Sequence, residues 1–319
     1  MPADTKQRVA IIGAGVSGLT CAVLFAERGF PTTIFAREAG QQTTSAAAAA
    51  IWFPYDAEPA AQVAAWSLRS FEVLQEIARD DASGVSIVEL RVFSREGEIE
   101  LPVWAGSLGA RRLPESQIKQ GIFTSGYTID VPVVDTTIHL DYLAERARVA
   151  GAVINSPSAL RSLDEVGREH TLIINCTGAG ARSLVGDTAI EPHRGQVAVV
   201  AKLELPYAIV CDDPPLMYAI PRRRDCVLGG TNDVSDNTEP SPDDTARILA
   251  ETARVLGIDA PPIVTERVGL RPFRRSGVRL EAEQLADGRT VIHNYGHGGS
   301  GFTLAWGCAE AVFALRGAG

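Results

Sequence analysis

The sequence predicts an α/β fold in which a domain built on a parallel sheet is interleaved with a second, mostly antiparallel α+β domain. A strand–helix–strand pattern opens the chain, a strand–helix pattern closes it, and short strands dominate the stretch between them. Because successive α/β units build one parallel sheet, we expect the two ends to join in one domain. The 319 residues suffice for two domains. The predicted boundaries are 1–55, 137–195 and 265–319 for the first domain and 56–136 and 196–264 for the second.

The first domain is predicted to begin with one complete strand–helix–strand unit. Arg8–Ile12 is a short apolar strand, and Pro31–Phe35 is a second one. The segment Leu19–Arg28 between them is apolar and alanine-rich, and Gly29 closes it, which is typical of a helix. The chain returns to this sheet with a helix at Thr137–Ala150, a buried strand at Thr171–Asn175, a strand at Val291–Tyr295 and a last apolar helix through Leu315.

The second domain is predicted to consist mostly of short strands. In Glu58–Asp80 the apolar side chains fall on one helical face, which predicts a helix. The segment Ile87–Val103 is typical of a hairpin with Gly97 in its turn. Pro242–Leu256 is a predicted helix with proline in its first turn. The strands expected between these helices are Gln196–Leu203, Tyr207–Cys211, Met217–Pro221 and Cys226–Leu228.

Glycines follow the first strand in the pattern Gly13-x-Gly15-x-x-Gly18. Gly13 permits a tight turn, Gly15 lets the backbone approach a pyrophosphate, and Gly18 lets the helix pack close to the sheet. The helix N-terminus adds N–H groups and a positive dipole for the phosphates. Because the motif stands between a strand and a helix, it predicts a Rossmann-like dinucleotide site.

Two charged residues near the end of the second strand are candidates for the ribose of that dinucleotide. Glu38 lies 25 residues after Gly13, close to the spacing expected of an acid that binds the ribose hydroxyls. Arg37 beside it suits a ribose phosphate or the adenine ring, and a solvated surface arginine is an equal alternative.

A second glycine cluster, Gly296–Gly301, directly precedes the last helix. Nothing structural requires so many glycines in one turn, and flexible backbone that meets a flat ligand is the natural reason. His293 and His297 lie beside this turn without a cluster of carboxylates. We therefore expect structural or cofactor-adjacent histidines and no metal site.

Arg271 is followed by Pro272, which favours an extended backbone at the arginine. A guanidinium fixed in this way suits bidentate binding of a carboxylate. A structural ion pair is the alternative interpretation of the same residue.

Composition excludes several classes of protein. The net charge of −9 argues against binding to nucleic acid or to anionic membranes. The five cysteines are scattered and never spaced C-x-x-C, so disulfides and a cysteine zinc site are not expected. The polar stretch Met1–Arg8 lacks the apolar core of a secretory signal, and we expect a cytoplasmic protein. A homodimer is compatible with the sequence.

Segments spread over nearly the whole chain resemble the D-amino acid oxidase family, and they occur in the order found in that family. The longest is Val-Ile-His-Asn-Tyr-Gly-His-Gly-Gly-Ser-Gly-Phe-Thr at Val291–Thr303, which continues into Trp306–Ala309. The others are Thr43–Ser45, Ala48–Trp52, Pro54-Tyr55, Asn175–Gly178, Arg194–Gln196, Tyr218–Pro221, Leu228–Thr231 and Gly269–Pro272.

This resemblance implies noncovalently bound FAD and oxidative deamination of a D-amino acid, by hydride transfer from Cα to flavin N5. The implied products are a 2-oxo acid, ammonia and hydrogen peroxide, because O2 reoxidises the flavin. By resemblance, Arg271 binds the substrate carboxylate and Tyr218 donates a second hydrogen bond to it. The Gly299 carbonyl accepts a hydrogen bond from the amino group. The implied FAD contacts are Gly13, Ala14, Gly15, Val16, Ser17, Gly18, Arg37, Glu38, Thr43, Thr44, Ala49, Ala50, Ile51, Thr177, Gly178, Arg271, Gly298, Gly299, Ser300, Gly301, Phe302 and Thr303.

The sequence departs from the family pattern at positions that bear on the substrate. Animal members carry a second tyrosine on a mobile lid, four residues before the equivalent of Tyr218, where this chain has Pro214. D-aspartate oxidases place an arginine where this chain has Asn232, so we expect neutral D-amino acids to be preferred over D-aspartate. The run Arg222–Arg224 is an alternative source of such a charge, although a solvated turn is the favoured interpretation.

Other functions stay open on the residues alone. An oxidase of the same fold that acts on glycine, a secondary amine or D-aspartate is the nearest alternative. An NAD-dependent dehydrogenase, or a regulator that only binds a dinucleotide, accounts for the first glycine motif. Neither accounts for Arg271, Tyr218 and the second glycine cluster together.

Overall fold

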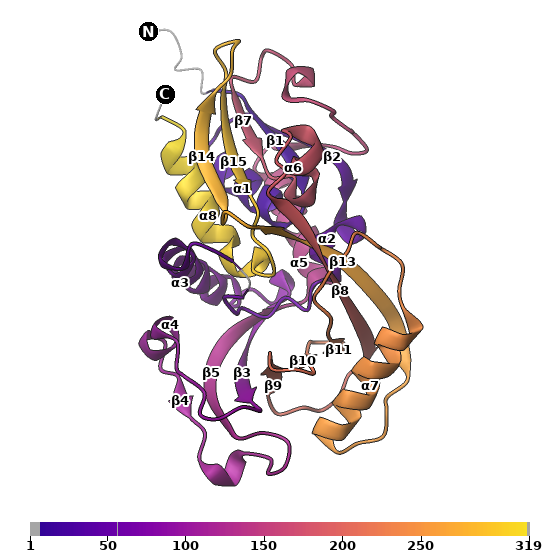
Figure 1. The fold of residues 1–319 in the computed structure, drawn as a ribbon. Helices are drawn as coiled ribbons and strands as arrows, with labels where there is room; N and C mark the ends of the chain where they lie inside the picture. Colours follow the sequence, from indigo (N-terminus) through magenta and orange to yellow (C-terminus); the bar gives the residue numbers. More distant parts are fainter. Residues whose placement is uncertain (1–6, 56, 318–319) are drawn as a thin grey trace.

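The fold contains two sheets, as a computed structural model that describes residues 7–55 and 57–317 shows (Figure 1). The first sheet has six strands in the order β14-β15-β7-β1-β2-β6. Its strands from β15 to β6 are parallel, and β14 is antiparallel at one edge. They are β1 (Val9–Ala14), β2 (Thr32–Ala39), β6 (Val153–Asn155), β7 (Leu172–Asn175), β14 (Arg279–Gln284) and β15 (Thr290–Tyr295).

The second sheet has nine strands and is mostly antiparallel. Its longest pairing joins β8 to β13, which run antiparallel along most of their lengths. The strands are β3 (Val85–Ser94), β4 (Arg111–Arg112), β5 (Ser125–Val134), β8 (Ile190–Ala201), β9 (Ala208–Cys211), β10 (Met217–Pro221), β11 (Asp225–Gly229), β12 (Asp233–Val234) and β13 (Ile263–Arg274). The predicted combination of a parallel and a mostly antiparallel sheet is confirmed.

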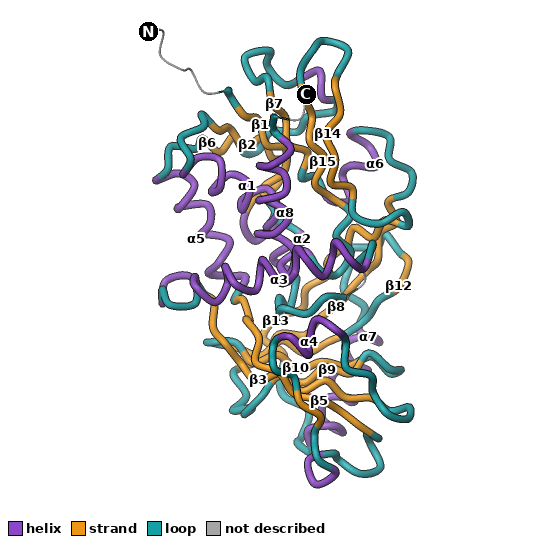
Figure 2. The backbone as a smooth tube through the Cα atoms, turned by 90° about the vertical axis from the view of Figure 1, so that its left-hand side faces the viewer, coloured by secondary structure: helices purple, strands orange, loops and turns teal. Residues whose placement is uncertain are grey.

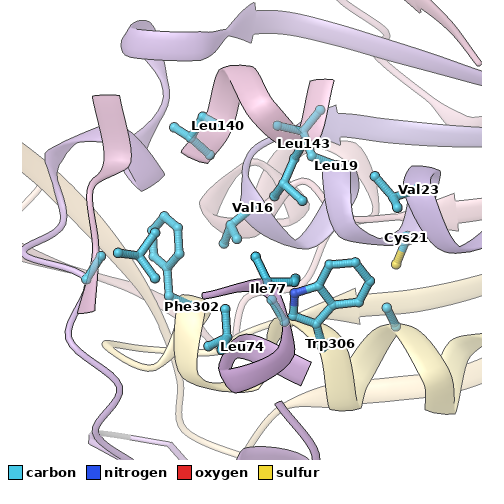
Figure 3. Close-up of a cluster of buried hydrophobic side chains, with 14 of the residues drawn as sticks. Val16, Leu19, Cys21, Val23, Leu74, Ile77, Leu140, Leu143, Phe302 and Trp306 are labelled. Carbon is cyan, nitrogen blue, oxygen red and sulfur yellow. The ribbon is translucent and has the colours of Figure 1, made fainter. Parts of the chain in front are cut away.

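A layer of helices joins the two sheets (Figure 2). The helix α1 follows β1. It is buried on nearly every side, because α5, α8 and the first sheet surround it. Side chains from α1, α3, α5 and α8 meet in one buried cluster, among them Leu19, Leu74, Leu140 and Trp306 (Figure 3). The helices are α1 (Val16–Glu27), α2 (Thr44–Ala47), α3 (Ala60–Ile77), α4 (Val103–Ser107), α5 (Thr136–Val149), α6 (Ala181–Leu184), α7 (Pro242–Leu256) and α8 (Gly301–Leu315). Within the described ranges, no helix is long and apolar enough to cross a bilayer.

The predicted hairpin at Ile87–Val103 is wrong. Gly97 does lie in a turn, with φ of 66°, but no strand follows it directly. Instead β3 pairs antiparallel with β5, from Val85 opposite Val134 to Ser94 opposite Ser125. All ten residues of β3 find a partner in β5, so this distant pairing satisfies more backbone groups than a short hairpin does.

The remaining predicted elements appear near their expected positions, and α7 has the predicted bounds. The boundaries of the two domains stay a prediction. Both β8 and β13 continue across those boundaries, and they carry the chain from the second sheet toward the first (Figure 1). A site between the sheets therefore draws residues from both.

Candidate active site

A cavity of about 1160 Å³ extends from the carboxyl end of β1 to one face of the second sheet. Ligands of open α/β sheets bind at this end of the strands. The cavity lining includes Tyr218 and every residue expected to contact FAD except Gly18 and Ser300. Residues far apart in the sequence are thus brought to one site.

The first glycine motif forms a close-packed turn at one end of the cavity. Gly13 has φ of 108°, and a Cβ there would lie 2.5 Å from the carbonyl oxygen of Cys176. A Cβ on Gly18 would lie 2.0 Å from the carbonyl oxygen of Gly13, so Gly18 serves helix packing and not the cavity wall. Gly15 precedes α1 and leaves its first turn without a side-chain cap from that position. This cradle fits the pyrophosphate of the dinucleotide that the sequence predicts.

The ribose candidates Arg37 and Glu38 lie at the end of β2 and line the cavity. Their side chains form an ion pair, with 3.3 Å between Arg37 Nε and Glu38 Oε1, and both are largely exposed. Ala50, on the same cavity, has a positive φ of 55° although it is not glycine. Such a conformation costs roughly 1–3 kcal/mol, and it occurs here where the backbone shapes a ligand site.

The second glycine cluster places the N-terminus of α8 at the cavity. Ser300 precedes this helix, but its hydroxyl donates a hydrogen bond to the Tyr55 carbonyl. The same hydroxyl accepts a hydrogen bond from the Tyr55 amide at 2.7 Å. The amides that begin α8 therefore have no side-chain cap from Ser300, and Gly301, Phe302 and Thr303 line the cavity. Gly299 makes room for Tyr55, since a Cβ there would lie 2.5 Å from the tyrosine ring.

Arg271 from β13 lies at the other end of the cavity. Its Nη1 donates to the Thr231 carbonyl at 2.8 Å and to Asn232 Oδ1 at 3.1 Å. Within residues 7–55 and 57–317, no carboxylate lies at ion-pair distance from Arg271, so the structural ion pair is not found there. Gly195 on β8 leaves space for the guanidinium, because a Cβ there would lie 2.4 Å from it.

Tyr218 from β10 faces the same cavity. It lies opposite Gly229 of β11, where a Cβ would be 2.0 Å from the tyrosine ring. Burial raises the pKa of Tyr218, while the Arg271 guanidinium opposes that rise. The hydroxyl therefore stays protonated near neutral pH and is able to donate a hydrogen bond.

Tyr55 is a cavity residue that the sequence analysis did not single out. Its hydroxyl accepts a hydrogen bond from Asn232 Nδ2 at 3.0 Å, which connects it through Asn232 to Arg271. The signal was present, because Tyr55 stands in one of the segments that resemble the oxidase family. Its role depends on Asn232, which lies 177 residues away.

The two histidines near the second glycine cluster, His293 and His297, are buried and hydrogen-bonded. His293 contacts Asn175 at 3.2 Å and Glu283 at 3.2 Å, and His297 contacts Asn294 at 3.0 Å. Burial lowers the pKa of His297 to about 4, so it is neutral at physiological pH. No group of three potential metal-ligating His, Cys, Asp or Glu side chains occurs in the described part of the chain.

The arginine run Arg222–Arg224 does not reach the cavity. Arg222 is buried and bonds to Asp225, with 2.6 Å between Arg222 Nε and Asp225 Oδ1. Arg223 pairs with Asp81 at 3.2 Å. The interpretation as a solvated turn is therefore wrong for Arg222, because its Nη1 also donates to Thr136 Oγ1 at 3.1 Å, a tertiary contact that the local sequence does not reveal.

Comparisons with known proteins show what the chain is similar to. A family model described as FAD dependent oxidoreductase matches residues 8–315. The chain is 41% identical to a D-amino-acid oxidase of Rubrobacter xylanophilus, over 98% of this chain and 96% of that protein. It is 39% identical to a D-amino-acid oxidase of Streptomyces coelicolor, over 96% of each. A solved structure of glycine oxidase from Geobacillus kaustophilus is similar with a TM-score of 0.80 at 17% identity, covering 98% of this chain and 94% of that one, which shows a shared fold.

Proposed function

The chain belongs to the D-amino acid oxidase family of FAD-dependent oxidoreductases, and from this premise we propose that it oxidises D-amino acids to 2-oxo acids. One molecule each of D-amino acid, O2 and water gives the 2-oxo acid, ammonia and hydrogen peroxide. The observation that supports the proposal most directly is Arg271, which has no carboxylate partner among the described residues and shares one cavity with the glycine cradle.

The residues of the cavity divide into a cofactor end and a substrate end. We propose that FAD lies along the two glycine motifs, with its pyrophosphate at Gly13–Gly18 and its ring system near Gly298–Thr303. Bound FAD supplies the acceptor for the two electrons of the substrate Cα–H bond and passes them to O2.

At the substrate end, the protein provides orientation. Arg271 binds the α-carboxylate through N–H groups of its planar fork, while the Thr231 carbonyl and Asn232 hold Nη1 in place. Tyr218 donates a second hydrogen bond to the carboxylate, and the Gly299 carbonyl accepts a hydrogen bond from the α-amino group. With the carboxylate and the amino group both fixed, only one enantiomer presents its Cα hydrogen toward the proposed flavin position, so the reaction depends mainly on positioning. In this proposal, the ammonium proton passes to water.

The cell location and partners are part of the same proposal. We propose a cytoplasmic enzyme whose partners are a small-molecule substrate and O2, with no nucleic acid or membrane partner. The net charge of −9 supports this, since it disfavours anionic polymers and lipid surfaces. A homodimer stays compatible with the sequence.

A substrate panel with peroxide detection tests the proposed reaction. The flavin-loaded protein is incubated with D- and L-amino acids, glycine and sarcosine. We expect peroxide from D-amino acids, essentially none from L-enantiomers, and less from D-aspartate than from neutral D-amino acids. Faster turnover of glycine or sarcosine than of every D-amino acid would replace the proposal with the secondary-amine alternative.

A further inference from the structure

We propose that Asp212 makes this oxidase selective for D-amino acids that carry a cationic side chain, an inference that rests on the function proposed above. Asp212 follows β9, in the turn that leads to β10. It lies in the lining of the same cavity as Arg271 and Tyr218.

The register of the two strands places Asp212 on the face that carries Tyr218. Val210 lies directly opposite Tyr218 in the β9–β10 pair, and such pairs point to the same side of a sheet. Continued one residue past the end of β9 and one residue before the start of β10, the alternation puts Asp212 on the side of Val210 and Leu216 on the side of Tyr218. All four residues line the cavity. The intervening Cys211 and Met217 belong to a buried hydrophobic cluster that does not line the cavity, as the alternation requires.

The Asp212 carboxylate has no partner in the described part of the chain, where no hydrogen bond or ion pair of its side chain occurs. The next residue, Asp213, differs completely. Its carboxylate accepts hydrogen bonds from Ser94 Oγ at 2.6 Å and from the Arg95 amide at 2.6 Å. Asp213 therefore holds the turn in place, whereas Asp212 presents an unpaired acid to the cavity.

The surroundings of Asp212 favour a cationic ligand. Asp212 is accessible to solvent at the open side of the cavity, and partial desolvation by the cavity wall, followed by the neighbouring Asp213 carboxylate, raises its pKa to about 6. No basic side chain in residues 7–55 and 57–317 pairs with the Asp212 carboxylate, so a cation that enters the cavity forms an ion pair that the protein does not make by itself. An acidic substrate side chain meets repulsion at the same position.

The neighbours of Asp212 suit the rest of a basic side chain. A D-arginine or D-lysine anchored by its carboxylate at Arg271 and Tyr218 carries a methylene stem and then a charge. Val210 and Leu216 offer apolar contacts to such a stem, and Asp212 offers the opposite charge at its end. The expectation of neutral substrates rested on Asn232 alone. With Asp212 included, the expected order is cationic, then neutral, then acidic.

D-Arginine and D-citrulline provide a matched pair of substrates, because the two side chains have nearly the same shape and differ in charge. Flavin-loaded protein is assayed for kcat/KM with both, at pH 8, as wild type, Asp212→Asn and Asp213→Asn. We expect the wild type to prefer D-arginine by about 10- to 100-fold, the range of a hydrogen bond to a charged group. Asp212→Asn should bring the ratio close to one through D-arginine alone.

Asp213→Asn is the control, since it removes the same charge from the same turn without facing the cavity. It should change the ratio by less than about threefold, as expected for a charge outside the site. A wild-type ratio of one or less, or an unchanged ratio in Asp212→Asn while D-citrulline is still oxidised, overturns the inference and leaves the oxidase function intact. If no D-amino acid yields peroxide, the proposed function fails and the inference falls with it.

Discussion

Arg271 Nη1 donates a hydrogen bond to the side-chain oxygen of Asn232 at 3.1 Å, and Asn232 in turn donates to the hydroxyl of Tyr55 at 3.0 Å. One short polar residue thus connects β13 with the segment that follows Ala50. Because the Thr231 carbonyl holds the same nitrogen at 2.8 Å, the plane of the guanidinium is set before any ligand arrives. Preorganisation of this kind lowers the entropic cost of orienting a bound carboxylate.

Replacing Arg271 should impair the reaction without removing the cofactor. A charge-assisted bidentate pair contributes roughly 1.5–3 kcal/mol or more, so Arg271→Ala should lower kcat/KM for D-amino acids by about 10-fold to several hundred-fold. Arg271→Lys should recover only part of this, because an ammonium lacks the planar fork. Steady-state kinetics and the visible flavin spectrum measure both effects. Near-normal kcat/KM in Arg271→Ala would remove the residue from the active site.

Asn232 should act as a positioning residue. Asn232→Ala removes an acceptor of Arg271 and the donor to Tyr55, and we expect kcat/KM to fall by about 3- to 10-fold. The D-arginine to D-citrulline ratio should stay constant, because Asp212 is untouched. Asn232→Ser, which retains a short polar group, should lie between wild type and alanine. Equal kinetics of all three proteins would contradict the positioning role.

Gly15→Leu should give a folded protein that does not hold FAD. Gly15 has ordinary backbone angles, φ −76° and ψ −178°, and an added Cβ meets only Ser45 Oγ at 3.0 Å within contact range. The leucine side chain would instead occupy the space proposed for the pyrophosphate. Gly13→Ala is the contrast, because its φ of 108° and a 2.5 Å approach to Cys176 predict a loss of stability. Circular dichroism and flavin absorbance separate the two outcomes, and full flavin occupancy in Gly15→Leu would refute the pyrophosphate assignment.

Because of His139, we expect the free energy of unfolding to fall in mild acid. Burial lowers the pKa of His139 to about 4, the Ser83 carbonyl opposes that shift, and the Arg146 guanidinium adds to it. Between pH about 6.5 and 4 the unfolded chain binds a proton that the folded chain does not, so stability falls as pH falls, by about 1.4 kcal/mol per pH unit. The His139→Asn variant retains an N–H that donates to the Ser83 carbonyl. The slope of its unfolding free energy against pH should be smaller by the contribution of about one proton. Urea unfolding at pH 7 and pH 5, with saturating FAD, tests this, and an unchanged slope would count against it.

The preference for cationic substrates should weaken in acid. In the described part of the chain, the titratable groups that interact electrostatically with Asp212 are Asp213, Tyr127 and Tyr218. Both tyrosine pKa values are raised and that of Asp213 is lowered, so Asp212, with its pKa of about 6, is the member of this set that titrates near neutrality. Protonation removes the charge that binds the substrate cation, and the D-arginine to D-citrulline ratio should fall as pH drops below about 6. A ratio that stays flat from pH 8 to 5 would assign the selectivity to another group.

Local chemistry explains which parts were predictable from sequence. The helix α7 was predicted with its observed bounds, because Pro242 at its first turn and Gly257 after its end are local signals. The glycine-rich segments Gly13–Gly18 and Gly296–Gly301 are likewise local signals, because a turn with positive φ or with close backbone packing favours glycine. From such signals, and from the segments that resemble the oxidase family, the sequence by itself determined the fold class and the family.

Contacts between distant segments were decided by the tertiary structure alone. No local signal shows that β3 pairs with β5, that Arg222 donates a hydrogen bond to Thr136, or that Tyr55 accepts one from Asn232. The two adjacent acids Asp212 and Asp213 look alike in the sequence, and only packing turns one toward Ser94 and the other toward the cavity. The physical reason is that hydrogen bonds, burial and desolvation depend on which surfaces meet, and these surfaces come from segments far apart along the chain.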